Sequence, residues 1–158
     1  LYIDGFVAGV KAQNSDVKVN VNYIDSFGDV LLASEAAKAF VELGADVMTG
    51  TAQMVVGATG VAAEEGIPWF GTQSNQTGLG AEIVVASQVY HWEVVLNTIL
   101  DQIAAGKLGG EAFVISLSNG GLEMEFNDSY ALDADIQASG VATIAGLSDG
   151  SITVPAGE

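Results

Sequence analysis

The sequence predicts an α/β domain built on a parallel β-sheet. Short apolar runs alternate with Ala-rich segments whose apolar residues recur at helical spacing. The apolar runs break into small and amide residues, as Ile67–Phe70 does before Gly71-Thr72-Gln73-Ser74-Asn75-Gln76. The connections are short, which favours right-handed β-α-β crossovers. In open sheets of this class, ligands bind outside the carboxyl ends of the strands.

Helices are expected where apolar residues recur every three to four positions. The expected helices are residues 4–14, 31–43, 54–65, 91–105 and 133–147. Asp4 is positioned as an N-cap of the first helix. Gly106 or Gly109 is expected to end the helix that begins at His91, and Gly140 and Gly146 are expected to interrupt the last one.

Strands are expected at short β-branched or aromatic runs between turn residues. The expected strands are residues 18–24, 46–49, 67–70, 83–87, 112–117, 122–126 and 152–154. The first alternates polar and apolar residues. The run 122–126 alternates after Gly120-Gly121 and is expected to be an edge or hairpin strand.

The composition indicates one globular domain with an acidic surface. The chain has 158 residues, 49% of them hydrophobic, and a formal net charge of −16. It contains only four basic residues, all lysines, so we expect no nucleic-acid partner and no guanidinium clamp. A saline habitat or an ordinary acidic extracellular protein would account for the charge. Zero cysteines exclude disulfides and thiol catalysis. The start at Leu1 lacks a signal peptide and resembles mid-protein sequence.

The sequence offers little catalytic chemistry, and we expect no enzyme activity, cofactor or metal. His91, the single histidine, is interpreted as packing or capping beside Trp92. The segment Gly57-Ala58-Thr59-Gly60 matches neither a Walker A loop nor a dinucleotide fingerprint. Glu123 and Glu125 share one face of an expected strand and are interpreted as solvated surface.

The loops that follow the expected strands carry the candidate binding residues. These side chains are Phe27, Asp29, Thr51, Gln53, Gln73, Ser74 and Asn75. An aromatic ring with amides and hydroxyls suits a neutral ligand that has a flat ring and many polar groups. The competing interpretation is that they are ordinary turn residues, since Asn, Ser and Asp favour turns.

Several motifs, in order along nearly the whole chain, resemble the basic membrane protein (BMP) family of solute-binding lipoproteins. The first is Asp4-Gly5-Phe6-x2-Gly9-Val10. Further matches are Tyr23-Ile24-Asp25-Ser26-Phe27-Gly28-Asp29, Gly44-Ala45-Asp46-Val47, Ala62-Ala63-Glu64-Glu65-Gly66, Gly71–Gln76, Val84–Trp92 and Gly106-Lys107-Leu108-Gly109-Gly110. The resemblance implies a Rossmann-like lobe of the type I periplasmic-binding fold.

The resemblance also implies a ligand, a purine nucleoside or a similar polar organic solute. Phe27 occupies the position of the aromatic residue that stacks on the base in this family. Gln73 and Asn75 stand where the family places the carboxylates that bind ribose hydroxyls, so this site is neutral where the family's is charged. Tyr90 and His91 replace a basic pair, and Tyr90 is a further candidate ligand contact.

By the same resemblance, residues 1–158 form the second, C-terminal lobe of a two-lobe receptor. Residues 88–111 are expected to cross to a missing N-terminal lobe, which would carry a lipid anchor outside the cytoplasm. The implied partners are the solute, an ABC transporter permease, and either that lobe or further copies of the chain. The alternative is a structural subunit of an extracellular assembly, because the apolar stripe from Trp92 to Ile103 would otherwise lack a partner.

Overall fold

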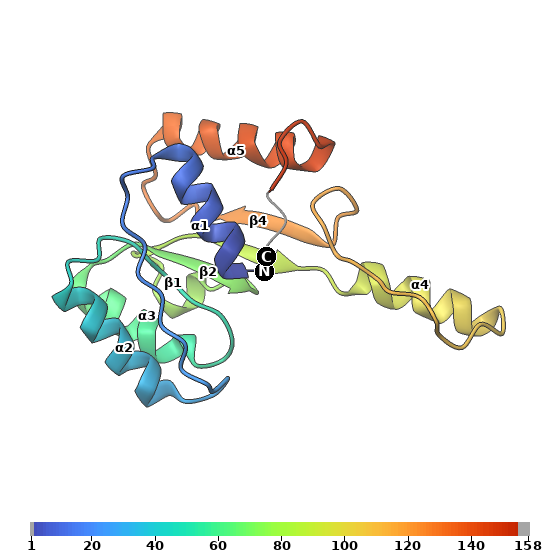
Figure 1. Cartoon of the computed structure of the whole chain (residues 1–158), viewed down its shortest axis with the longest axis horizontal. Coiled ribbons are helices and arrows are strands. Elements are labelled where there is room, and N and C mark those ends of the chain that lie inside the picture. The colour runs from blue at the N-terminus through green and yellow to red at the C-terminus, as the bar shows by residue number, and fades with distance from the viewer. Residues whose placement is uncertain (1, 155–158) are drawn as a thin grey trace.

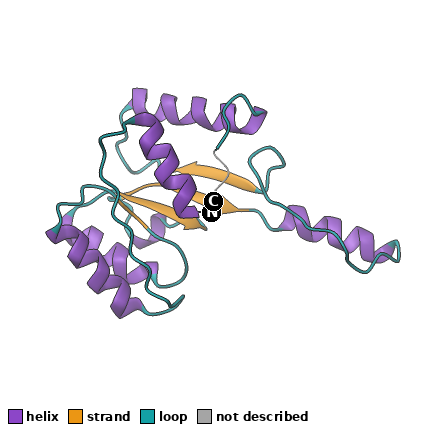
Figure 2. Ribbon diagram, in the orientation of Figure 1, coloured by secondary structure: helices purple, strands orange, loops and turns teal. Residues whose placement is uncertain are grey.

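A four-stranded β-sheet separates the helices of this protein into two layers (Figures 1 and 2). The computed structural model describes residues 2–154. The strands, in their order across the sheet, are β1 (Met48–Thr49), β2 (Trp69–Gln73), β3 (Val84–Tyr90) and β4 (Leu122–Phe126). The first three run parallel, and β4 pairs antiparallel with β3 at the edge.

The helices cover the two faces of the sheet unequally. Their bounds are α1 (Tyr2–Gln13), α2 (Val30–Glu42), α3 (Val55–Glu65), the 3-10 helix η1 (Thr77–Leu79), α4 (Glu93–Ala104) and α5 (Ala134–Asp149). Figure 1 shows α2 and α3 on one side of the sheet and α1 and α5 on the other. Helix α4 projects away from the sheet, and the chain returns alongside it.

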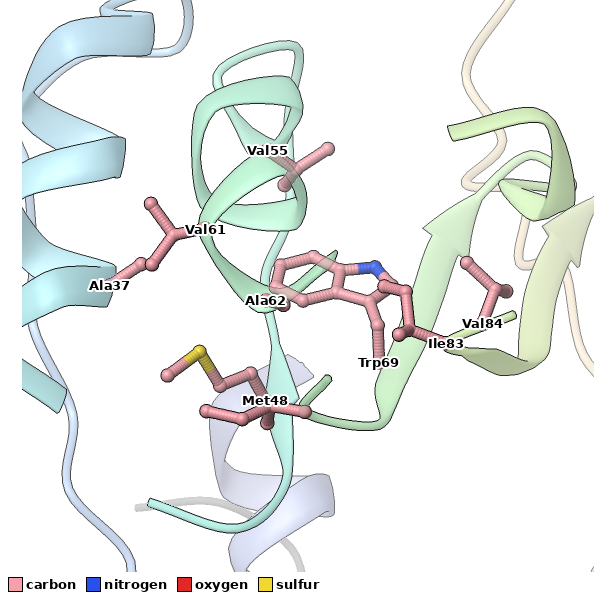
Figure 3. Packing of buried hydrophobic residues seen from close by; sticks show 9 residues of the cluster. Ala37, Met48, Val55, Val61, Ala62, Trp69, Ile83 and Val84 are labelled. Atoms are coloured by element: carbon pink, nitrogen blue, oxygen red, sulfur yellow. The ribbon is translucent and has the colours of Figure 1, made fainter. Parts of the chain in front are cut away.

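The hydrophobic core lies between β1–β3 and the α2–α3 pair. Trp69 on β2 is 1% exposed and is the largest fully buried side chain among the described residues. Figure 3 shows its ring between Ala62 of α3 and Ile83 and Val84 near β3. The indole Nε1 donates a hydrogen bond of 2.8 Å to Oε1 of Gln76, so the polar edge of this ring is satisfied inside the core.

Small residues let α2 and α3 pack closely. Ala33 and Ala37 of α2 are both 2% exposed. At Gly57 of α3, a Cβ atom would lie 2.1 Å from the carbonyl oxygen of Val30. A side chain at this position would therefore push the start of α2 away from α3.

Glycines end the helices where the sequence places them. Gly66 follows α3 with φ +67°, and the amide of Ile67 donates to the carbonyl of Ala62, as in a Schellman ending. Gly106, with φ +78°, comes immediately after Ala105, the C-cap of α4. Glycine adopts this left-handed backbone without the penalty that a Cβ brings.

Three of the expected strands are wrong: residues 18–24, 112–117 and 152–154 form no strand. Alternation in 18–24 fits an extended chain, but a strand also needs a hydrogen-bonded neighbour, and β1 at that edge has only two residues. Residues 112–117 run back along α4, away from the sheet (Figure 2). The expected edge strand at 122–126 is confirmed as β4.

Two details of the helix expectations are also wrong. Asp4 lies in the first turn of α1, which already begins at Tyr2, so it is not an N-cap. Gly140 and Gly146 do not interrupt α5, which runs continuously to Asp149. Both glycines face close neighbours: a Cβ would lie 3.3 Å from the Phe126 ring at Gly140 and 2.7 Å from Ile152 at Gly146. The lack of a side chain here serves packing.

Candidate functional site: a pocket at the carboxyl edge of the sheet

The loops that follow β1 and β2 border a pocket of about 470 Å³ that is open to solvent. The β1–α3 loop and the start of α3 form one wall, and the segment from β2 into η1 forms the other. The lining residues are Ala52, Gln53, Val55, Val56, Thr72, Gln73, Ser74, Asn75, Gln76, Gly78 and Leu79. The pocket thus lies at the carboxyl ends of parallel strands, where α/β sheets bind ligands.

The backbone is strained at the tips of this edge. Among the described residues, the non-glycine positions with positive φ are Asp25 (+55°), Ala52 (+70°) and Gln73 (+72°). Each follows an expected or observed strand, and two of them line the pocket. Such conformations cost about 1–3 kcal/mol each and persist only where the surroundings enforce them. The fold therefore holds these tips in a fixed shape.

A buried hydrogen-bond network supports the pocket floor. Gln76 is 7% exposed. Its side-chain Nε2 donates to the carbonyl of Thr72 (2.8 Å), and its backbone amide donates to Oγ of Ser87 (3.0 Å). Its Oε1 accepts from the Trp69 indole. At Gly71 a Cβ would lie 2.6 Å from Oγ of Ser87, so only glycine fits between the strands here. The network links the core tryptophan to the pocket.

The structure brings only some of the predicted site residues into the pocket. Gln53, Gln73, Ser74 and Asn75 line it with exposed side chains, whereas Thr51 lies in the same loop but not in the lining.

The predicted tip that carries Phe27 and Asp29 borders the pocket loop. The carbonyl of Phe27 accepts a 3.0 Å hydrogen bond from the amide of Met54, and the Phe27 ring is 81% exposed. Asp29 has a structural task, because its Oδ1 accepts from the amide of Leu32 (3.0 Å) and caps α2.

Tyr90 lies away from the pocket. Successive residues of a strand point to opposite faces, and Ser87 of β3 faces Gln76. Tyr90 therefore points to the α1 side, and its ring meets the Trp92 ring edge-on at a centroid distance of 5.9 Å. Burial raises the pKa of the Tyr2 phenol, while its hydrogen bond to Thr49 opposes the shift.

Sequence reasoning missed part of the pocket. Thr72 lines it and donates from Oγ1 to the carbonyl of Gly50 (2.8 Å), and Val55, Val56 and Leu79 add an apolar wall. Thr72 lies in the stretch expected at the end of a strand, but its hydrogen bond to Gly50 depends on the position of the neighbouring strand, β1. The apolar wall comes from the start of α3, which the sequence predicted only as a helix, and from η1, which the sequence did not predict.

His91 takes part in a polar cluster at the base of α4 and does not cap the helix. The N-cap of α4 is Trp92. The His91 Nε2 lies 3.1 Å from Oε2 of Glu123, and its Nδ1 lies 3.0 Å from Oε1 of Glu93. These contacts raise the pKa of the imidazole, and the contact with Glu123 has the larger effect. Glu125 accepts a 2.6 Å hydrogen bond from Nδ2 of Asn75, so the cluster borders the pocket.

Across residues 2–154, no helix has both the length and the hydropathy of a membrane span.

Fold and pocket together define a class of protein: an α/β domain with a pocket of mixed polar and apolar lining at the carboxyl ends of parallel strands. The family model of the PnrA-like ABC transporter substrate-binding proteins (Bmp) matches residues 1–145. The chain therefore belongs to the Bmp family.

Individual relatives agree with this assignment. The "ABC transporter nucleoside-binding protein BmpA" of Lactococcus lactis subsp. cremoris is 28% identical, with 96% of this chain and 48% of the relative covered. The "Transcriptional activator protein med" of Bacillus subtilis is 29% identical, with 85% and 43% covered. A solved ABC transporter solute-binding protein from Conexibacter woesei matches with a TM-score of 0.74 at 23% identity, with 96% and 51% covered. The chain spans about half the length of these relatives.

Proposed function

We propose that this chain is one lobe of an extracytoplasmic solute-binding protein that captures a polar organic solute for an ABC importer. The observation that carries the proposal is the pocket at the carboxyl edge, where amide side chains project from strained, fixed tips. A preformed set of donors and acceptors binds a neutral ligand without large ordering costs. The Bmp family match supports the same class of function.

A purine nucleoside is the first candidate solute. The amides of Gln53, Gln73 and Asn75 can pair with hydroxyl and ring-nitrogen groups. The exposed Phe27 ring beside the pocket offers a stacking surface for a flat base. The name of the BmpA relative supports a nucleoside. Helix α3 adds a partial positive charge, because it starts at the pocket and its N-cap, Met54, makes no side-chain capping bond.

A second lobe would complete the site over this edge. The chain spans about half of its relatives, and the arm formed by residues 91–111, which begins after β3 ends at Tyr90, carries exposed apolar side chains away from the sheet. Trp92, Leu96 and Leu100 are each more than half exposed. We infer that this arm packs against an N-terminal lobe, that the solute is held between the lobes, and that the loaded receptor docks on a permease. The lipid anchor would belong to that lobe.

The alternative of a structural subunit is not favoured by the family match, and the named relatives are binding proteins or a transcriptional activator rather than enzymes.

Calorimetric titration of the full-length two-lobe protein with a panel of nucleosides and other polar solutes tests the proposal. We expect saturable binding of at least one member. Gln53→Ala and Gln73→Asn should weaken it by about tenfold or more, because each removes a hydrogen bond to a buried ligand group; Asn tolerates the left-handed backbone at residue 73. Gln13→Ala, an exposed residue at the end of α1, is the matched control. A folded protein that binds no member of the panel would overturn the proposal.

A further inference from the structure

Three metal-ligating side chains meet at the edge of the sheet, outside the pocket lining. One ligand atom from each of His91, Glu123 and Glu125 lies within 4.8 Å of the others. Glu123 and Glu125 pair with Val89 and Ser87 across the β3–β4 ladder, and the amide of His91 donates to Gly121 (2.9 Å). Alternating residues share a face, so the ladder itself places the three side chains together.

We propose that His91, Glu123 and Glu125 form a binding site for a divalent transition-metal cation, with Zn²⁺ as the best match. The donor set is one imidazole nitrogen and two carboxylates, a combination that zinc accepts in sites with three protein ligands and open positions. The two carboxylates offset the charge of the cation, and the net charge of −16 attracts cations to this surface.

The groups around the cluster already orient it for this task. Glu93 lies 3.0 Å from Nδ1 of His91, so it can hold the proton on Nδ1 and leave the Nε2 lone pair free for a metal. Asn75 donates to Glu125 (2.6 Å) and fixes that carboxylate. A carboxylate behind a ligating histidine and a hydrogen bond on a ligating carboxylate are the usual outer supports of metal sites.

Only small side-chain movements are needed to close the site. Zinc sits about 2.0–2.2 Å from nitrogen and oxygen ligands, which places neighbouring donors roughly 3.4 Å apart in a tetrahedron. Nε2 of His91 and Oε2 of Glu123 already lie 3.1 Å apart, and the Glu123 side chain is 60% exposed and free to rotate. The cation would replace the direct contact between these two atoms. This inference does not depend on the proposed solute.

The test is a Zn²⁺ titration of the chelator-treated chain, followed by calorimetry and by nitrogen NMR of the imidazole. Because His91 is the only histidine, its Nε2 signal can be assigned without ambiguity. We expect saturable binding with a large shift of Nε2. His91→Asn, Glu123→Gln and Glu125→Gln should each weaken binding at least about tenfold. Glu111→Gln, an exposed carboxylate on the arm, is the matched control and should leave binding unchanged.

The role of Glu93 has its own readout. Glu93→Gln should weaken Zn²⁺ binding by about 10–100-fold and should also change the tautomer balance in the metal-free NMR spectrum, since Glu93 at Nδ1 and Glu123 at Nε2 then no longer compete equally for the imidazole proton. Circular dichroism checks that every variant is folded. No saturable binding up to about 1 mM Zn²⁺, an unshifted Nε2, or equal binding by the carboxylate variants and the control would overturn the proposal.

Discussion

The two tryptophans of this chain divide it into a packed body and an exposed arm. Trp69, in the body, is 1% exposed and hydrogen-bonded to Gln76, whereas Trp92, at the base of the arm, is 55% exposed. Helix α3 in the body buries four of its residues; α4 in the arm buries none. Both helices are rich in apolar residues. The difference is that α3 has a sheet and a second helix to pack against.

This contrast shows that local sequence determines where a helix forms, whereas burial of its apolar side chains depends on what packs against it. Spacing is enough to form α4, but its apolar stripe stays exposed within this chain. Exposed apolar stripes of this kind are typical of surfaces that pack against another domain or protein, as proposed above for the N-terminal lobe. The stripe buries little within this chain and therefore contributes little to its free energy of unfolding, so substitutions in the two regions should behave differently.

The largest expected effect comes from Trp69, with Trp92 as its comparison. Trp69→Ala should lower the free energy of unfolding by about 3–5 kcal/mol, because it leaves a cavity and removes the partner of Gln76. Trp92→Ala should change it by less than about 0.5 kcal/mol in this chain. Urea denaturation of both variants measures the two values. Equal losses would show that the arm packs on the body.

A pair of glycines in α3 sharpens the comparison inside the body. Gly57→Ala should destabilise by about 1–3 kcal/mol, since its Cβ would meet the Val30 carbonyl at 2.1 Å. Gly60→Ala, with open space around it, should stabilise by up to about 1 kcal/mol through helix propensity. Thermal unfolding gives both signs, and two changes of the same sign would contradict the tight α2–α3 contact.

Asp29 offers an effect of intermediate size and separates two roles. Asp29→Ala should cost about 1 kcal/mol of stability, because the amide of Leu32 loses its cap. Asp29→Asn keeps a capping oxygen and should cost little. Asp46→Ala, an exposed acidic residue near β1, is the control in denaturant unfolding. If Asp29→Asn retains stability in the full-length protein yet loses solute affinity, Asp29 contacts the ligand as well.

The smallest effect on stability is expected in the arm. Leu100→Glu, at a position 62% exposed on α4, should leave the free energy of unfolding within about 0.5 kcal/mol. The same change should reduce self-association of this chain, because it places a charge in the apolar stripe. Light scattering over a range of concentrations measures this; Thr98→Glu, on an exposed part of the same helix, is the control. Unchanged assembly size in both variants would exclude contact through the stripe.

The sequence predicts the body of this molecule better than its edges. The strands around Trp69 and Val84 are confirmed because each is a buried apolar run whose partners lie one crossover away. Residues 18–24 and 112–117 have equally suitable patterns, but pairing depends on a distant edge that no local pattern reports. The sheet also gains an antiparallel strand, so β3 extends to Tyr90, beyond the expected end at Ser87.

The candidate site also has a part that the sequence predicts and a part that it does not. Gln73 ends β2, and Gln53 and Asn75 lie in the loops after β1 and β2, so strand direction is enough to bring all three to one edge. Asp29 and His91 were given other roles by sequence, because a capping bond to Leu32 and a contact with Glu123 exist only once the chain is folded. The alternation of Glu123 and Glu125 was visible, but their meeting with His91 follows from the β3–β4 register.

The base of the arm is narrow, since one outgoing and one returning segment join it to the sheet. The amide of His91 donates to Gly121 (2.9 Å), and the amide of Leu122 donates to Ser116 (3.0 Å). A helix of twelve residues such as α4 is about 18 Å long. A tilt of roughly 5° at this neck then moves the far end by about 1.5 Å, by geometry alone. A small rotation at the sheet edge therefore displaces the far end of α4 more than its base, and a distance label at the far end would measure this displacement.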